Sequence, residues 1–286
     1  MNAKETAIWL CLAWLWGSSF LAIGIAVETV SPVDVVAGRM GIGAAFLILI
    51  LLLGKGSLRM GWRAWLIATV VGLSGNVLPF LLISFAEQRV DSGLAALIMG
   101  IAPVVTLVIA PLVHHEETLG RRKIVGALIG FCGIGVLVGP NAFEDMGYET
   151  LAQIALLGAA FCYAFTALFS RRFPHEKPMQ TAAASVLIGA VVIGIISIAN
   201  WQEQTASASS LLAIVYLGIG PTALAAAIYF YLIPRIGAGR LQQVNYVVPV
   251  LGTLLGIFVL HEQPTLNTWI AIPFILAAVY IVTRKA

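Results

Sequence analysis

The sequence predicts an all-α integral membrane protein with ten transmembrane helices, arranged as two inverted five-helix repeats around a central cavity. Three observations lead to this fold class: an apolar composition, ten apolar stretches of spanning length, and an internal repeat whose copies differ in flanking charge. Of the 286 residues, 60% are hydrophobic and 10% are charged, whereas soluble domains have about 45–50% apolar and about 25% charged residues. Such a chain cannot cover its surface with polar side chains, so its solvent must be lipid.

Ten stretches are long enough to cross a bilayer, which takes about 20 mainly apolar residues. They are 6–27, 33–53, 64–86, 92–113, 120–139, 151–171, 179–200, 209–233, 238–260 and 266–283. The connections between them are short, and none has room for a soluble domain. The first stretch has no small-residue cleavage site followed by a soluble domain, so we interpret it as a retained helix rather than a signal peptide.

Basic residues in short loops set the orientation, because they favour the cytoplasm. With the N-terminus inside, 14 of the 16 Lys and Arg residues lie in cytoplasmic segments. Only Arg89 falls outside, and Arg39 lies within the second helix. The acidic loop with Glu144, Asp145 and Glu149 falls outside as well. We therefore expect a multi-pass protein with both termini in the cytoplasm.

An internal repeat appears when the second half is shifted onto the first by 146 positions. Over the fourth and ninth stretches the matched pairs are Arg89 with Arg235, Gly93 with Gly239, Pro103 with Pro249, His115 with His261 and Glu116 with Glu262. Basic residues follow the first His-Glu pair but not the second, as expected if the copies cross the membrane in opposite senses. We therefore predict two repeats, 1–140 and 141–286, in the inverted arrangement typical of secondary transporters.

These features resemble a known family. The ten helices, the duplication, the segment 16–20 (Trp-Gly-Ser-Ser-Phe), Ala102-Pro103 and His115-Glu116 are similar to the EamA branch of the drug/metabolite transporter (DMT) superfamily, over the whole chain. The resemblance implies an exporter of small metabolites in the bacterial inner membrane, working by alternating access. Within the family the chain looks most like the aromatic amino-acid exporter (YddG-like) type. The resemblance also implies that helices 1, 3, 4, 6, 8 and 9 surround the cavity, with 5 and 10 peripheral.

Polar and aromatic side chains gather on the stretches expected to line the cavity, while the fifth and tenth stretches are almost wholly apolar inside. Amides, hydroxyls and aromatic rings suit an uncharged or zwitterionic substrate with an apolar side chain. The candidate substrate-binding residues are Trp16, Ser19, Asn76, Phe80, Met99, Tyr163, Tyr229, Gln243, Asn245 and Tyr246. The alternative for each Ser or Thr is a bond to its own helix carbonyl, and for each Tyr, packing between helices.

Four prolines fall in the same inner helices: Pro79, Pro103, Pro221 and Pro249. A proline inside a helix frees a carbonyl and bends the helix, so we predict these four as hinge or kink positions. Prolines are also simply tolerated in membrane helices. Pro273, in a peripheral helix, does not follow the pattern.

Charged residues near the spans leave alternatives open. No Asp or Glu lies at the centre of a span, so the protein is either a facilitator or has its coupling residue nearer a mouth. Arg39 either pairs with Asp34, Glu28 or Asp91, or attracts a substrate carboxylate, or extends to the interface. Each His-Glu pair is interpreted as a helix-end cap or gate contact.

Other classes of function find no support. The sequence contains no nucleophile motif, P-loop or metal-ligand spacing, so we predict no enzyme activity, cofactor or metal. The net charge of +3 does not indicate nucleic acid, and the expected partners are a small-molecule substrate and the lipid bilayer. A homodimer is possible, but a monomer is adequate. The remaining alternatives are efflux of another substrate class, such as nucleosides or cationic drugs, and a channel-like facilitator.

Overall fold

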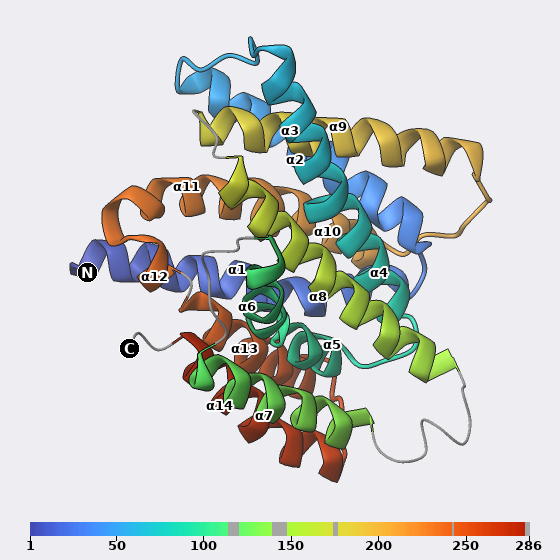
Figure 1. The fold of residues 1–286 in the computed structure, drawn as a ribbon. Helices are drawn as coiled ribbons and strands as arrows, with labels where there is room; N and C mark the ends of the chain where they lie inside the picture. The colour runs from blue at the N-terminus through green and yellow to red at the C-terminus, as the bar shows by residue number, and fades with distance from the viewer. Residues whose placement is uncertain (114–119, 139–147, 174–176, 242, 284–286) are drawn as a thin grey trace.

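The computed structural model describes the chain except for residues 114–119, 139–147, 174–176, 242 and 284–286. Within these limits every regular element is a helix, and the helices form ten crossings in the predicted order (Figure 1). Seven crossings are apolar helical spans of at least 18 residues, and three are shorter apolar helices. The predicted fold class is confirmed.

Six crossings are single helices: α1 (Ala3–Val27), α2 (Pro32–Leu53), α7 (Arg121–Val138), α8 (Tyr148–Arg172), α9 (Pro178–Ala199) and α14 (Leu266–Thr283). The other four are interrupted. The third runs through α3 (Trp62–Gly72), η1 (Leu73–Val77) and α4 (Leu78–Ala86), and the fourth through α5 (Ser92–Met99) and α6 (Ala102–Val113). The eighth consists of α10 (Ala208–Leu217), η3 (Gly218–Leu224) and α11 (Ala225–Ile236), and the ninth of α12 (Ala238–Leu241) and α13 (Val244–Val259).

Helix ends are fixed by local signals in the sequence. Asn2 and Glu5 form a capping box at the start of α1, with each side chain accepting the other's backbone N–H at 2.8 and 3.0 Å. Ser31 caps α2, and Pro32 occupies its first position, where no N–H is needed. α1 begins and α14 ends at the same end of the bundle (left in Figure 1), as an even number of crossings requires.

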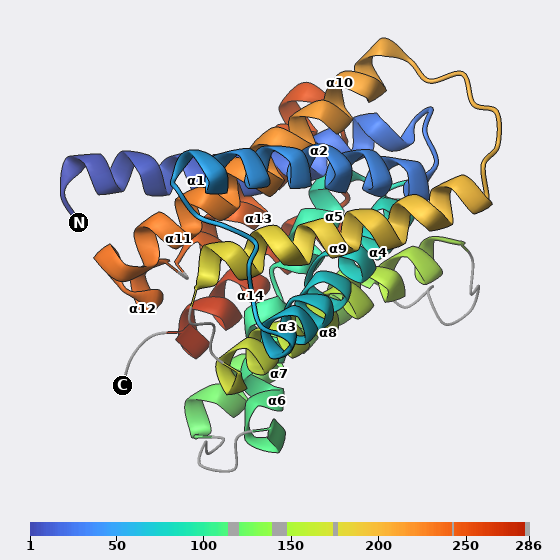
Figure 2. The same ribbon diagram turned by 90° about the horizontal axis from the view of Figure 1, so that it is seen from above.

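The two halves make the same contacts. α2 packs against its repeat mate α9, α5 against α13, and α7 against α14. Where α2 contacts η3 of the other half, α9 contacts α3 and η1 in return. The pairs α4 with α8 and α11 with α1 exchange in the same way. α7 and α14 lie together along one side of the molecule, away from α3 and α9 (Figure 1), and Figure 2 views the molecule from the α3 and α9 side. This agrees with the expected peripheral place of α7 and α14.

Two π-helical segments fall at equivalent positions of the repeats. η1 covers residues 73–77 and η3 covers 218–224, so a shift of 146 places the first inside the second. A π-turn inserts one extra residue into a helix and is found mostly at functional sites. The sequence revealed the repeat only over the fourth and ninth crossings, and these segments extend it to the third and eighth.

A pair of glycines shows the same symmetry at atomic detail. A Cβ on Gly72 would overlap the backbone carbonyl of Ser185, and a Cβ on Gly218 would lie 3.0 Å from the carbonyl oxygen of Arg39. Gly218 is the repeat mate of Gly72, and Ser185 is the repeat mate of Arg39. Without a hydrophobic effect between helices in lipid, such close backbone approach is a main source of packing energy.

Candidate substrate site

The central feature of the site is a buried cation. Arg39 lies on α2 and is 5% exposed. Its Nε donates a hydrogen bond of 2.9 Å to Oγ1 of Thr222 in η3. Its guanidinium carbon lies 3.6 Å from the centre of the Phe80 ring on α4. Arg39 therefore points into the protein, and the expectation that it extends to the interface is wrong.

Four crossings meet around this cation. Tyr163 on α8 is close enough to Arg39 to interact with it electrostatically. Its ring also packs against two separate hydrophobic clusters, one around α2 and α9 and one around α5 and α8. We call Arg39, Phe80, Tyr163 and Thr222 the Arg39 group. The two π-segments help to build it, since Thr222 lies within η3 and Phe80 follows η1 by three residues.

The environment of Arg39 is unusual for a charge at membrane depth. Such charges normally pair with a carboxylate or face a wet cavity. The predicted partner Asp34 is engaged elsewhere, accepting hydrogen bonds from Ser31, Ser197 and Gln204. In the part of the chain that the structure describes, no carboxylate forms an ion pair with Arg39. A guanidinium has five N–H donors, and Thr222 receives one of them.

A second aromatic group lies between α1 and α11. The rings of Trp16 and Tyr229 have centroids 6.0 Å apart, and Phe230 meets Tyr229 edge-on at 5.4 Å. Ser19 donates to the carbonyl of Trp16 at 2.7 Å, so this hydroxyl follows the alternative of bonding its own helix. Trp16 and Tyr229 were both predicted as site residues, and the structure brings them together, separately from Phe80 and Tyr163.

The remaining predicted residues are more dispersed. Asn76 is half-buried within η1, and Met99 is buried at the end of α5. Gln243 is exposed at the start of α13, and Asn245, two residues later, is half-buried. The side chain of Tyr246 lies outside the described residues, as do Gln242 and the pair His115-Glu116.

The four predicted kink prolines lie at or near interruptions. Pro221 is inside η3, and Pro79 is the second residue of the helix that follows η1. Pro103 is the second residue of α6, directly after the break that separates α6 from α5. Pro249 differs, because it lies within continuous α13, with its ring against Gly100. Whether these positions act as hinges remains a prediction.

Two glutamates near one end of the bundle escaped the sequence-based list of site residues. Glu262 accepts hydrogen bonds from the N–H and Oγ of Ser92, at 2.8 and 2.6 Å, and from the N–H of Gly93 at 2.9 Å. It therefore caps the start of α5, as predicted for a His-Glu pair. Glu87 follows α4 and is buried. From the sequence, Glu87 could only be placed at the end of a span. Whether its side chain is buried depends on the helices that pack around it, which the sequence does not show.

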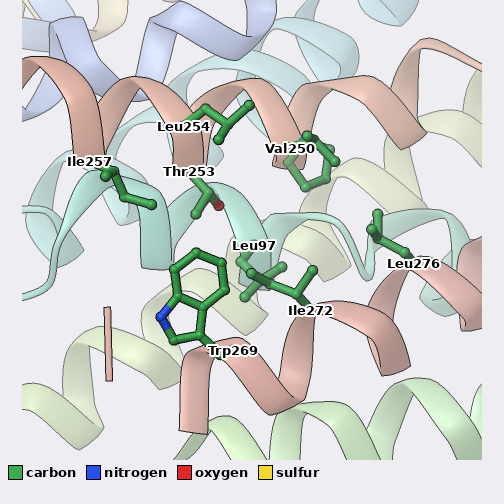
Figure 3. A pocket seen from close by; sticks show the side chains of 9 residues that line it. Leu97, Val250, Thr253, Leu254, Ile257, Trp269, Ile272 and Leu276 are labelled. Carbon is green, nitrogen blue, oxygen red and sulfur yellow. The ribbon is translucent and has the colours of Figure 1, made fainter. Parts of the chain in front are cut away.

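An apolar pocket of about 170 Å³ lies elsewhere, between α5, α13 and α14 (Figure 3). Leu97, Leu254, Trp269 and Ile272 are among its lining residues, and Leu254 and Trp269 are exposed on the outer surface. Its one polar side chain, Thr253, already donates to the carbonyl of Gly93. The pocket opens on the outer surface, and its almost wholly apolar lining has no charged group that would recognise a zwitterionic substrate.

Comparison with known proteins agrees with this architecture. The model of the EamA-like transporter family matches residues 5–139 and again residues 150–284. The chain belongs to the EamA-like transporter family. It is 30% identical over 272 residues to the uncharacterized inner membrane transporter YedA of Escherichia coli, covering 94% of this chain and 87% of YedA. It is also 24% identical over 280 residues to an uncharacterized transporter of Archaeoglobus fulgidus, covering 97% of this chain and 99% of the relative.

The fold has a counterpart among solved structures. One crystal structure superposes with a TM-score of 0.70 and 23% identity, covering 99% of this chain and 98% of the other. Together with the family match, this identifies the EamA-like chain as a multi-pass membrane transporter. The two relatives above are named as transporters, and neither name gives a substrate.

Proposed function

We propose that this EamA-like protein exports amino acids, aromatic ones included, across the bacterial inner membrane by alternating access. One observation carries the proposal: the guanidinium of Arg39 is buried between four crossings, stacked on an aromatic ring, with no described carboxylate partner. A buried cation without a counter-ion is costly. Binding an anionic group would offset that cost.

The chemistry around Arg39 suits an α-amino acid. The terminal NH2 groups of a guanidinium can hold a carboxylate through two parallel hydrogen bonds. Phe80 and Tyr163 provide aromatic surfaces for an apolar or aromatic side chain. A cationic drug would be repelled by Arg39, and a nucleoside has no carboxylate to bind it. The site therefore favours amino acids over these alternatives.

The repeat architecture supports alternating access over a fixed channel. Inverted repeats allow one scaffold to take two conformations by exchanging the roles of its halves. η1 and η3 interrupt equivalent helices next to the Arg39 group, so bending there would open the site to one side or the other. We further propose, from the distribution of Lys and Arg, that both termini are cytoplasmic, and that a monomer is the working unit.

Counterflow in liposomes tests the proposal. Purified protein would be reconstituted into liposomes preloaded with one amino acid, and entry of labelled tryptophan, phenylalanine, threonine and a nucleoside would be measured. We expect exchange of tryptophan and phenylalanine, loss of exchange in Arg39→Gln, and no change in Arg89→Gln, which removes an exposed arginine near one end of the bundle. Saturation and counterflow separate a carrier from a channel. Nucleoside exchange that is insensitive to Arg39→Gln would overturn the amino-acid assignment.

A further inference from the structure

A carboxyl group without partners lies at the end of the bundle where α4 ends and α5 begins. Glu87 is 8% exposed, and both of its carboxyl oxygens are closed off from solvent. Within the described part of the chain neither oxygen has a hydrogen-bond partner. An ionised carboxylate in such surroundings is strongly disfavoured, while the neutral acid is tolerated. The geometry therefore describes a protonated carboxyl.

The charged neighbours of Glu87 come from two elements. Glu262, after α13, and Arg39, on α2, both interact with it electrostatically. The charge of Glu262 is stabilised by three donors at the start of α5, so the proton of this carboxyl pair belongs on Glu87. From α1 the uncharged backbone of Gly24 comes close to this carboxyl and interacts with it, without a hydrogen bond of normal geometry.

The pKa of Glu87, just beyond the span Trp62–Ala86, follows the same logic. Burial raises this pKa well above its ordinary value, and the negative charge of Glu262 raises it further. Arg39 and the backbone of Gly24 act in the opposite direction and lower it. Asp91, four residues on and exposed, also has a raised pKa, from burial of part of its carboxyl and from Glu262 and Glu149. Acidic groups at this end therefore favour proton binding.

We propose that Glu87 is the proton-binding site of a proton/amino-acid antiport cycle, in which one carboxylate holds either a proton or the ammonium group of the substrate. This inference rests on the amino-acid transport proposed above. Arg39 and Glu87 interact electrostatically but form no ion pair. A substrate carboxylate held at Arg39 brings the ammonium on the same α-carbon toward Glu87.

Competition between a proton and the substrate ammonium for Glu87 couples the movement of protons to the movement of amino acids. The carboxylate takes a proton from the aqueous phase at its own end of the bundle, and the buried carboxyl without hydrogen-bond partners in this structure corresponds to that neutral acid. When the site opens to the other face, the proton leaves and an ammonium takes its place as the counter-charge. No covalent bond to the substrate forms, and one proton crosses inward for each amino acid that crosses outward.

Glu87→Gln separates coupling from transport, because glutamine mimics the neutral acid. In liposomes without a gradient, we expect the variant to retain phenylalanine counterflow with affinity roughly tenfold weaker, the effect of losing one charged hydrogen bond. Under an imposed pH gradient, the wild type accumulates phenylalanine and the variant does not. Glu28→Gln is the matched control, since Glu28 is exposed at the end of α1, and it should behave as the wild type.

Two further measurements keep the outcomes distinct. Infrared spectroscopy of the wild type should show a protonated carboxylic acid band that Glu87→Gln removes. Glu262→Gln removes a neighbouring negative charge, lowers the pKa of Glu87, and should move the pH midpoint of gradient-driven transport to lower pH. Gradient-driven accumulation by Glu87→Gln, or accumulation driven by sodium instead, would overturn the proton site. No counterflow in folded wild type would overturn the amino-acid function, and the infrared band would then decide whether Glu87 holds a proton.

Discussion

The interface between α2 and η3 and the interface between α9 and the α3–η1 segment are related by the internal repeat. Both are built on the close approach of a glycine to a backbone carbonyl: Gly218 to that of Arg39, and Gly72 to that of Ser185. Their side chains differ. Arg39 reaches across to Thr222 and Phe80, while the hydroxyl of Ser185 bonds the carbonyl of Ala182 in its own helix. The duplicated scaffold is thus symmetric in backbone packing and asymmetric in chemistry.

This comparison indicates how the two halves divide their tasks. Under the alternating access proposed above, the shared glycine contacts would keep the same packing in both conformations and would be needed in both copies. The proposed substrate site needs its charge only once, and Arg39 of the first half would supply it. Substitutions of matched side chains at the two interfaces should therefore have unequal effects on transport. Substitutions of the matched glycines should have similar effects on stability.

The largest expected difference is between Arg39 and its mate Ser185. Arg39→Gln should reduce amino-acid exchange by on the order of 100-fold, because it removes a buried, charge-assisted carboxylate contact. Ser185→Ala removes a hydroxyl that bonds its own helix, and exchange should stay within about twofold. Initial rates of counterflow, normalised to folded protein, measure both. Equal losses in the two variants would show that the asymmetry has no functional meaning.

Gly72→Ala and Gly218→Ala come next and probe the packing. Each added methyl meets the facing helix, so both variants should be destabilised by about 1–3 kcal/mol. Gly72→Ala should be the worse of the two, because its methyl overlaps backbone, which cannot move aside. Thermal unfolding in detergent measures the effect. Gly41→Ala is the control, since a Cβ there meets nothing within 4 Å, and a comparable loss in it would refute the close-approach argument.

Phe80 tests the stacked cation with a smaller effect. Phe80→Leu keeps an apolar side chain and removes the ring beneath Arg39, which is worth about 0.5–2 kcal/mol. We expect roughly tenfold weaker substrate affinity with folding preserved, measured from the concentration dependence of exchange. Its repeat mate is Ala226, so the second half has no ring to lose. Unchanged affinity in Phe80→Leu would remove the ring from the site.

The smallest effects concern two hydrogen bonds between helices. Ser18 bonds the hydroxyl of Tyr216 at 2.6 Å, and Ser74 bonds Thr166 at 2.7 Å. They join the first crossing to the eighth and the third to the sixth, which are repeat-related pairs. Tyr216→Phe and Thr166→Val should each cost about 0.6 kcal/mol, the average for such bonds in membrane proteins. A loss several times larger in only one of them would show that the two interfaces are not equivalent.

Much of the fold could be predicted from the sequence because the bilayer constrains it strongly. A crossing needs a fixed length of apolar residues with its backbone bonded internally, so ten apolar stretches predict ten crossings. The structure agrees at most ends to within a few residues, although the first helix begins at Ala3 and the eighth crossing continues to Ile236. The π-segments were not predicted, since one extra residue in a helix leaves hydropathy unchanged.

The candidate site could be predicted only in part. Phe80 and Tyr163 were identified from residue type and helix, and both lie beside Arg39 in the structure. Arg39 itself was considered, but the sequence could not decide between a partner, a substrate and the interface. Hydropathy gives the depth of a residue and not the direction of its side chain, which depends on how neighbouring helices are rotated.

The class of protein, the number of crossings and the inverted repeat could be predicted from the sequence, because they depend on local composition and on similarity along the chain. The packing of Arg39 against Phe80 and Thr222, and the burial of Glu87 without hydrogen-bond partners, became known from the folded chain. Both depend on contacts between helices far apart in the sequence. In lipid, close packing and hydrogen bonding between helices fix those contacts. Hydrophobicity, the property most easily read from the sequence, does not fix them.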